Sequence, residues 1–285
     1  LFRVFIGFFQ SFFILLKYNS RDTLVFSTGG FVSLPVVYAA KLTGKQVFIH
    51  EQTSVSGLAN KLASFIADKI FISFESSKKY FPAEKTFFSG YPLRDECFTR
   101  EVTKVVIDGV LLKETSKPIL FITGGGNGSK LLNELLLDNI ELLTRDYFIV
   151  HQVGKLFINQ FQKYTNDSYK PIAFIDKEMI DLFKLSSVII SRAGAGTIAE
   201  LLALRKKSIL IPLRNSAKNE QYLNAKEAEK DLGSIIVEED NLKAVNIVEL
   251  CNVILQSKLP YDTSNETVRA KDKLIDEIAG YVLND

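Results

Sequence analysis

The sequence predicts an α/β protein made of two domains, each built around a doubly wound parallel sheet. Three segments repeat one arrangement, in which an apolar strand ends in a glycine-rich turn and a helical pattern follows. These strands cover residues 23–27, 118–123 and 188–190. Glycines at such turns let the backbone approach a ligand at the start of the next helix, which is typical of doubly wound sheets. A chain of 285 residues is long enough for two domains with separate cores.

The bulk composition indicates a globular protein. Hydrophobic residues make up 47% and charged residues 24%, and a formal net charge of +2 gives no sign of a nucleic-acid-binding surface. Cys97 and Cys251 have neither CxxC spacing nor a nearby histidine, so we predict no disulfide framework and no metal site. His50 and His151 are the only histidines, which leaves few imidazoles to act as a base.

Residues 1–16, LFRVFIGFFQSFFILL, predict an amphipathic helix with a broad apolar face that is too short to span a membrane. One helical stripe carries Arg3, Gly7, Gln10 and Ser11. We expect burial against a sheet to account for most of the apolar side chains. Shallow insertion into a membrane surface is the alternative. The candidates for membrane contact are Phe5, Phe9, Phe12 and Phe13.

Further short strands alternate with helical patterns along the chain, which is the pattern of an α/β fold. The predicted strands cover residues 46–49, 69–74, 86–89, 148–152, 172–174, 208–211 and 234–237. The pattern loosens between residues 94 and 117, where we place the domain boundary. The predicted domains are residues 1–114 and 115–263, and residues 264–285 form a charge-rich terminal helix expected to pack toward the first domain.

Two of the glycine turns, GGGNGS and RAGAGT, lie in the second half of the chain. Backbone N–H groups at a helix start bind anions, so two such turns in one domain predict a phosphorylated ligand in the crevice above the sheet. Glu200 follows the second turn, where its carboxylate could bind a ribose or could simply be favoured by the helix dipole. Neither a nicotinamide-type GxGxxG with a later acid nor a GxxxxGK[ST] loop is present.

Several longer motifs occur in one order, and together they resemble the bacterial MurG family. They are STGGFVSLPVVYAAKLTGKQVFIHEQTSVSGLANKLASFIADKI, FFSGYPLR, FITGGGNGSKLLN, AFID, SRAGAGTIAELLA and NEQYLNA. The family moves N-acetylglucosamine from UDP-N-acetylglucosamine to a lipid-diphosphate-linked muramyl-pentapeptide in peptidoglycan synthesis. The resemblance implies a GT-B fold, in which two Rossmann-like domains flank a cleft. It also implies an inverting, cofactor-independent hexosyltransferase that rests peripherally on the cytoplasmic face of the cell membrane.

The resemblance also implies the residues that contact the substrates. Ile175 matches a position beside the uracil, and Glu200 matches the acid on the ribose. Arg94 matches an arginine that reaches the donor, and Thr53 takes the place of an asparagine. The full set of implied substrate-binding residues is Thr53, Arg94, Gly126, Asn127, Ile175, Arg192, Gly194, Ala195, Thr197, Glu200, Glu220, Gln221 and Asn224. The departures from the family pattern are at Phe31, Thr53, Tyr91, Gly126 with Asn127, and Glu220.

The general base is not identified within the chain. In the family it is a histidine in an N-terminal glycine-rich loop, and because this sequence begins with Leu1 we expect that loop to precede it. His50 and Glu51 are the candidates inside the chain. Two alternatives stay open: another GT-B enzyme acting on a lipid or a sugar nucleotide, and a non-catalytic UDP-sugar-binding protein associated with the membrane.

Overall fold

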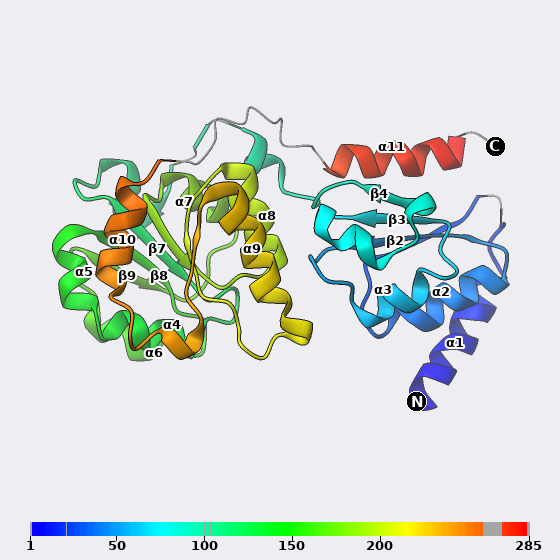
Figure 1. Cartoon of the computed structure of the whole chain (residues 1–285), viewed down its shortest axis with the longest axis horizontal. Helices are drawn as coiled ribbons and strands as arrows, with labels where there is room; N and C mark the ends of the chain where they lie inside the picture. The colour runs from blue at the N-terminus through cyan, green and yellow to red at the C-terminus, as the bar shows by residue number, and fades with distance from the viewer. Residues whose placement is uncertain (1, 21, 100, 103, 259–269, 284–285) are drawn as a thin grey trace. The chain divides into compact units, whose positions relative to one another are not determined.

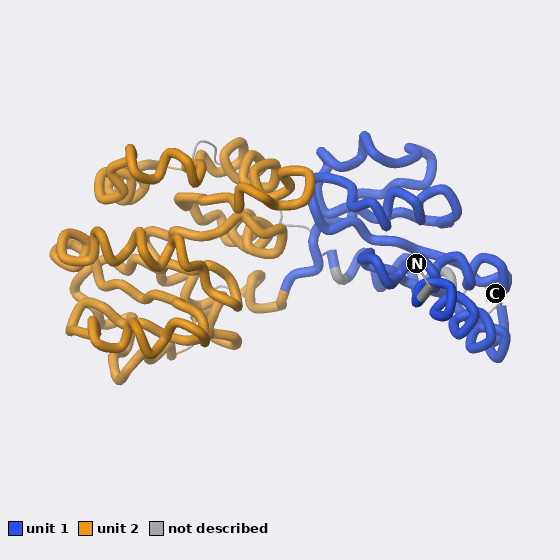
Figure 2. The backbone as a smooth tube through the Cα atoms, turned by 90° about the horizontal axis from the view of Figure 1, so that it is seen from below, with its two compact units in different colours: residues 1–93, 268–285 blue, residues 94–267 orange. Residues whose placement is uncertain are grey.

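The computed structural model describes residues 2–20, 22–99, 101–102, 104–258 and 270–283. The chain divides into two compact units, coloured separately in Figure 2. Unit 1 comprises Leu1–Leu93 with Val268–Asp285, and unit 2 comprises Arg94–Thr267. The predicted first domain extends to residue 114, so residues 94–114 belong instead to unit 2. Each unit is an α/β structure around a parallel sheet (Figure 1).

The sheet of unit 1 has four parallel strands in the order in which they occur along the chain. They are β1 (Leu24–Ser27), β2 (Gln46–Glu51), β3 (Lys69–Ile72) and β4 (Thr86–Phe88). Side chains alternate between the two faces, as strand geometry requires. On one face Val47 and Ile49 contact α2 (Ser33–Leu42) and α3 (Leu58–Ala63), and on the other Phe48 and Phe71 contact α11 (Ala270–Leu283) through Leu274 (Figure 1).

Helix α1 (Phe2–Leu15) packs against α2 through one stripe that combines small and apolar residues, and the rest of its apolar face stays exposed. Gly7 faces Pro35, and the Ser11 hydroxyl donates to the Gly7 carbonyl at 2.7 Å. Phe8, Phe12 and Leu15 contact the core. The exposed side chains include Phe5, Ile6, Phe9, Phe13 and Ile14. The expectation that most of the apolar residues are buried is therefore wrong, because small residues allow the closest approach between helices.

The sheet of unit 2 has six parallel strands in the order β12-β11-β10-β7-β8-β9. They are β7 (Ile119–Thr123), β8 (Phe148–Gln152), β9 (Tyr169–Ile172), β10 (Val188–Ser191), β11 (Ile209–Leu210) and β12 (Ile235–Ile236). Numbered from β7, this is the doubly wound order 3-2-1-4-5-6 read in reverse. Successive strands are added outward from β7 in one direction and from β10 in the other, so the order reverses between these two strands.

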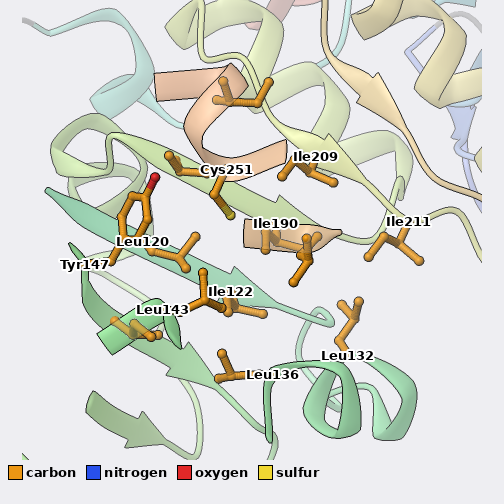
Figure 3. Packing of buried hydrophobic residues seen from close by; sticks show 14 of the residues in the cluster. Leu120, Ile122, Leu132, Leu136, Leu143, Tyr147, Ile190, Ile209, Ile211 and Cys251 are labelled. Atoms are coloured by element: carbon orange, nitrogen blue, oxygen red, sulfur yellow. The ribbon is translucent and has the colours of Figure 1, made fainter. Parts of the chain in front are cut away.

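Helices cover both faces of this sheet. On one face, α4 (Lys130–Leu137), α5 (Ile140–Asp146) and α10 (Ile247–Gln256) pack over Leu120, Ile122 and Ile190, with Leu132 and Leu143 among the contacting residues (Figure 3). On the other face, Phe121 packs edge to face against Phe183 of α7 (Met179–Leu185), with ring centroids 5.5 Å apart. The remaining helices of unit 2 are α6 (Ile158–Phe161), α8 (Ala195–Leu204) and α9 (Glu220–Leu232).

The short elements include one hairpin that the sequence analysis does not predict, formed by β5 (Val106–Ile107) and β6 (Val110–Leu111). Short 3₁₀ helices complete the described elements. They are η1 (Glu75–Tyr80), η2 (Ala83–Lys85), η3 (Asp95–Phe98), η4 (Leu112–Glu114), η5 (Gln162–Tyr164), η6 (Ala217–Asn219) and η7 (Glu239–Asn241). No helix in the described ranges is both long enough and apolar enough to cross a membrane.

Most predicted strands occur within a residue or two of their expected bounds, but β9 does not. It covers Tyr169–Ile172, whereas the apolar run predicted a strand at residues 172–174. Strand β9 lies at the edge of its sheet, where Pro171 is tolerated because one side needs no hydrogen-bond donor. The predicted terminal helix begins at Ala270 as α11, and residues 264–269 lie outside the described residues.

The two histidines predict that stability falls on mild acidification. Burial lowers the pKa of His50 to about 4 and that of His151 to about 3. In the unfolded chain a histidine has a pKa of about 6.5 and binds a proton as the pH falls below that value. In the folded chain the buried histidine stays neutral down to a lower pH, so acid favours the unfolded state. Each unit should therefore lose up to about 2 kcal/mol of unfolding free energy between pH 7.5 and pH 5. Denaturant titrations at several pH values measure this loss. Replacing His151 by Gln should flatten the pH dependence of unit 2, and an unchanged slope would contradict the prediction.

Candidate functional site

The point where the strand order of unit 2 reverses brings two glycine-rich loops together. Thr123, at the end of β7, is in register with Ser191, at the end of β10. The backbone N–H of Arg192 donates to the Thr123 carbonyl at 3.4 Å, so the chains leaving the two strands start side by side. One chain leads to α4 and the other to α8. Doubly wound sheets bind ligands at such a reversal, above the carboxyl ends of the strands.

The first loop, residues 124–128, is held by glycines that no larger residue can replace. A Cβ on Gly128 would lie 2.0 Å from the Val153 carbonyl oxygen, and one on Gly154 would lie 2.3 Å from the Asn127 carbonyl oxygen. A Cβ on Gly124 would lie 2.4 Å from the Ser129 nitrogen. These distances are shorter than any contact that can be accommodated without moving the backbone. The three glycines therefore fix the path of the loop.

Two other glycines in the same loop have a different environment. Gly125 has φ +83°, and a Cβ there would meet nothing within 4 Å. A Cβ on Gly126 would meet only the Phe174 ring edge, at 3.4 Å. Gly125, Gly126 and Asn127 are exposed. The outer part of this loop therefore presents its backbone to solvent, where it can approach a ligand closely.

The second loop opens α8, a helix of ten residues. Its N-cap, Gly194, has no side-chain cap within the described structure, and a Cβ there would meet nothing within 4 Å. Gly194, Ala195, Gly196 and Thr197 are all partly accessible. The N–H groups of this first turn thus face a half-open space, where the helix dipole favours an anion. In α4, by contrast, the Ser129 hydroxyl caps the helix by accepting from the Leu132 N–H.

Arg192 joins the two loops through buried contacts. Its guanidinium donates to the Ser129 hydroxyl and to the Ile211 carbonyl, each at 3.0 Å. Its Nη1 also lies 2.6 Å from Glu239 Oε1, in an ion pair whose side chains are 13% and 18% exposed. In this arrangement the guanidinium ties the start of α4 to the ends of β10 and β11 and to η7. The predicted contact between Arg192 and a ligand stays a prediction.

Ile175, which is predicted to lie beside the uracil, is buried and precedes Asp176, which Arg94 contacts. Arg94 donates to the Asp176 carbonyl at 2.9 Å and to its carboxylate at 3.1 Å. The backbone N–H of Ile175 donates to the side chain of Gln152 at 2.9 Å. The turn that follows β9 is therefore held from two sides. Arg94 belongs to unit 2, and not to the predicted first domain.

Glu200 is half-buried on α8 and makes no hydrogen bond within the described part of the chain. Burial raises the pKa of its carboxyl, and the nearby charge of Arg94 partly opposes that rise. Burial, with a contribution from Glu200, likewise raises the pKa of the Cys97 thiol to about 11. An unpaired acceptor in a partly desolvated position has the chemistry needed to bind ligand hydroxyls.

The residues predicted to hold the sugar lie at the start of α9. The N–H of Leu213 donates to the Gln221 side-chain oxygen at 3.0 Å, and buried Asn224 donates to the Ala193 carbonyl at 3.3 Å. Glu220, the first residue of α9, is half-buried. A cavity of about 260 Å³ adjoins this helix start, lined by residues that include Leu213, Tyr222 and Glu239. Asn224 therefore stabilises the loop before α8 through its bond to Ala193, while Glu220 remains partly accessible.

In unit 1, both candidates for the general base are enclosed by the protein. His50 is fully buried, with Nε2 3.2 Å from the Ser73 hydroxyl and 3.3 Å from the Gly90 carbonyl. Glu51 is 4% exposed and accepts from the N–H groups of Thr53 and Gly57. Its carboxylate thereby shapes the turn before α3. Both side chains have structural partners in this arrangement, and neither presents its polar atoms to solvent.

The predicted substrate-binding residues divide between the two units. Unit 2 brings the glycine loops, Ile175, Arg94 and Glu200 to one end of its sheet, whereas Thr53 lies in unit 1. Thr53 donates from its hydroxyl to Glu51 at 2.9 Å. Among the departures in unit 1, Phe31 is 72% exposed. In the described residues, no group of three or more His, Cys, Asp or Glu side chains is placed to hold a metal ion.

The side chains that hold the loops in place are not predicted from the sequence. They are Thr123, Ser129, Gln152, Asp176 and Glu239. One of them left a signal, because the apolar strand FIVHQ ends in two polar residues immediately before a glycine turn. Polar residues at the end of a buried strand are expected to have partners. The pairing of Arg192 with Glu239 joins segments far apart in the chain and left no local signal.

Two family models match the chain. The glycosyltransferase family 28 N-terminal domain matches residues 1–72, and the C-terminal domain of that family matches residues 119–278. A UDP-N-acetylglucosamine--N-acetylmuramyl-(pentapeptide) pyrophosphoryl-undecaprenol N-acetylglucosamine transferase from Clostridium botulinum (strain Kyoto / Type A2) is 36% identical over 263 residues. The aligned region covers 91% of this chain and 72% of that protein.

Solved structures show the same fold. The crystal structure of Acinetobacter baumannii MurG, at 24% identity, matches with a TM-score of 0.70 over 100% of this chain and 79% of that chain. The UDP-GlcNAc 2-epimerase of Methanocaldococcus jannaschii, solved with UDP-GlcNAc and UDP, matches at 13% identity with a TM-score of 0.62, over 97% and 80% of the chains. The predicted GT-B fold is confirmed.

The glycine contacts predict which substitutions the first loop tolerates. Gly128→Ala should destabilise unit 2 by more than about 2 kcal/mol, because its Cβ meets backbone and its φ is +75°. Gly126→Ala is the matched control and should change stability by less than about 0.5 kcal/mol, since only a ring edge lies nearby. Thermal and denaturant unfolding measure both. Equal stability of the two variants would contradict this account of the loop.

Proposed function

The chain belongs to glycosyltransferase family 28 and, within it, to the MurG family, and on this premise we propose how its two units carry out a sugar transfer. The donor is UDP-N-acetylglucosamine and the acceptor is a lipid-diphosphate-linked muramyl-pentapeptide. The acceptor hydroxyl attacks the anomeric carbon of the donor and gives up its proton to a general base. The bond from that carbon to the diphosphate breaks, UDP leaves, and the configuration at the carbon inverts.

The observation that carries this proposal is the pair of loops at the strand-order reversal of unit 2. The exposed backbone at Gly125 and Gly126 faces the same edge of the sheet as the uncapped start of α8 at Gly194. The donor diphosphate binds there, where N–H groups and the helix dipole stabilise the negative charge that grows as UDP leaves. Backbone N–H groups that are already in place lower the activation barrier of the transfer without a further change in structure.

The nucleoside part of the donor binds beside these loops. Ile175 lies next to the uracil, and the Glu200 carboxylate accepts hydrogen bonds from the ribose hydroxyls. Glu200 has no other hydrogen-bond partner in the described structure, which supports this role. Glu220, Gln221 and Asn224 lie on the sugar side. A carboxylate at position 220 can only accept hydrogen bonds, whereas the family's glutamine can also donate.

Unit 1 serves the acceptor and the membrane. The exposed apolar face of α1, with Phe5, Phe9 and Phe13, inserts shallowly into the cytoplasmic leaflet, and Arg3 and Lys17 are exposed near its ends. Phe12 contributes less than predicted to this surface, because it packs toward Phe8 with ring centroids 6.3 Å apart. Peripheral attachment of this kind brings the enzyme to a lipid-linked acceptor.

The donor site predicts that Glu200→Ala weakens the binding of UDP-N-acetylglucosamine by about 1 to 3 kcal/mol, the cost of losing hydrogen bonds to a charged group. Isothermal titration calorimetry measures this change. Glu249→Ala, at an exposed position on α10, is the control and should leave the affinity unchanged. An unchanged affinity for the Glu200 variant would remove this carboxylate from the donor site.

The membrane surface predicts that the double variant Phe9→Asp with Phe13→Asp loses binding to anionic vesicles by at least about tenfold, since two exposed rings give up their burial in lipid. Co-sedimentation with vesicles containing phosphatidylglycerol measures the bound fraction. The control is Leu142→Asp with Leu156→Asp, which introduces the same charge at exposed apolar positions in unit 2. Equal losses in both double variants would reject a specific role for α1.

A further inference from the structure

We propose that Gln152 is a positioning residue that sets the diphosphate loop and the base-side turn of the donor site relative to each other. The proposal rests on the donor site described above. Gln152 is fully buried at the end of β8. It has no exposed surface with which to contact a substrate, so it acts through the two segments it holds.

The side-chain amide of Gln152 bonds to segments on both sides of its strand. Its Nε2 donates to the Gly125 carbonyl at 2.9 Å and to the Thr123 hydroxyl at 3.3 Å. Its Oε1 accepts from the Ile175 N–H at 2.9 Å. The Thr123 hydroxyl in turn accepts from the Gly125 N–H at 3.1 Å. A single buried amide therefore connects the first glycine loop to the turn after β9.

These bonds fix which way the amide faces. A carbonyl oxygen needs the donor Nε2, and an N–H group needs the acceptor Oε1, so the reversed amide would oppose like groups on both sides. A buried amide that satisfies all these partners in only one orientation constrains the partners as firmly as they constrain it. The separation between Gly125 and Ile175 is therefore set by the length of one side chain.

The position of Gln152 explains why a side chain does this work. It is the last residue of β8 in register with both neighbours, opposite Thr123 on β7 and Ile172 on β9. Beyond this point the two flanking segments diverge into loops and the regular ladder ends. One backbone bond follows it, from the Val153 N–H to the Ile172 carbonyl at 2.9 Å, and the amide adds the side-chain connections to Gly125 and Ile175. The loops therefore keep a fixed spacing although neither is regular structure.

The spacing matters because one ligand spans it. The uracil lies beside Ile175 and the diphosphate lies over the exposed backbone at Gly125 and Gly126. When the loop and the turn are already in place, binding loses less conformational entropy in the protein. If either segment is misplaced, a ligand that contacts both of them binds more weakly. Loss of the amide should thus weaken the binding of UDP, which spans both segments. It should also weaken the binding of uridine, which uses the turn at Ile175.

Three variants separate this role from general stability. Gln152→Leu removes all bonds of the amide. Thr123→Val removes only the hydroxyl on the phosphate side and leaves the bond to Ile175. Tyr169→Phe is the control, because it removes a buried hydroxyl that bonds to His151 at 3.0 Å on the neighbouring position of β8. Calorimetry with UDP and ligand-observed NMR with uridine measure affinity, and thermal unfolding measures stability.

We expect Gln152→Leu to raise the dissociation constant for UDP by about tenfold or more and to raise that for uridine as well. Thr123→Val should weaken UDP and leave uridine unchanged, and Tyr169→Phe should leave both unchanged even where it lowers the unfolding midpoint. Unchanged UDP affinity in folded Gln152→Leu, or the same loss in Tyr169→Phe, would overturn the proposal. If Gln152→Leu does not fold, equal effects of Thr123→Val on UDP and uridine would overturn it. Failure of the unaltered chain to bind UDP would instead overturn the proposed donor, and this inference with it.

Discussion

The reversal of strand order between β7 and β10 is the constraint on which the donor site of unit 2 depends. Because Thr123 and Ser191 are in register, the segments that leave these strands begin next to each other. One then forms α4, which packs on the core through Leu132, and the other forms α8. Two adjacent segments that diverge in this way leave backbone N–H groups facing the same space. The proposed anion site is therefore a consequence of topology, and the sequence needs only to keep that space open.

Keeping it open requires loops that are irregular and yet held in place, and buried polar side chains meet both needs. Arg192 ties Ser129 to the ends of β10 and β11, and Gln152 ties Gly125 to Ile175. Gln152 is fully buried and the Arg192 side chain is 13% exposed, so each would be costly without partners. Because these side chains direct the loop contacts inward, the exposed backbone at Gly126 and the partly exposed helix start at Gly194 remain accessible to a ligand.

The sequence predicts the parts of this arrangement that are local. Apolar runs locate β7, β8 and β10, and small residues after them locate the glycine loops. It does not predict which stripe of α1 faces the protein, because periodicity does not assign a direction to either stripe. The packed stripe combines Gly7 and Ser11 with Phe8 and Phe12, and it leaves the other phenylalanines of the described helix exposed. Nor does it predict the partners of Arg192 and Gln152, since these bonds join segments that only the folded sheet brings together. The resemblance to known transferases supplies the identity of the ligand, which local chemistry limits only to a phosphorylated compound.

Glu200 shows how the same site balances stability against binding. Burial raises the pKa of its carboxyl, which means that the folded unit disfavours the charged form that a ribose requires. The charge of Arg94 opposes this shift, and Arg94 is itself held by Asp176 beside the base-side turn. The carboxyl therefore has a positive charge nearby but no hydrogen-bond donor within the described part of the chain. In the proposed complex with UDP-N-acetylglucosamine, the ribose hydroxyls would supply these hydrogen-bond donors to the partly desolvated carboxyl.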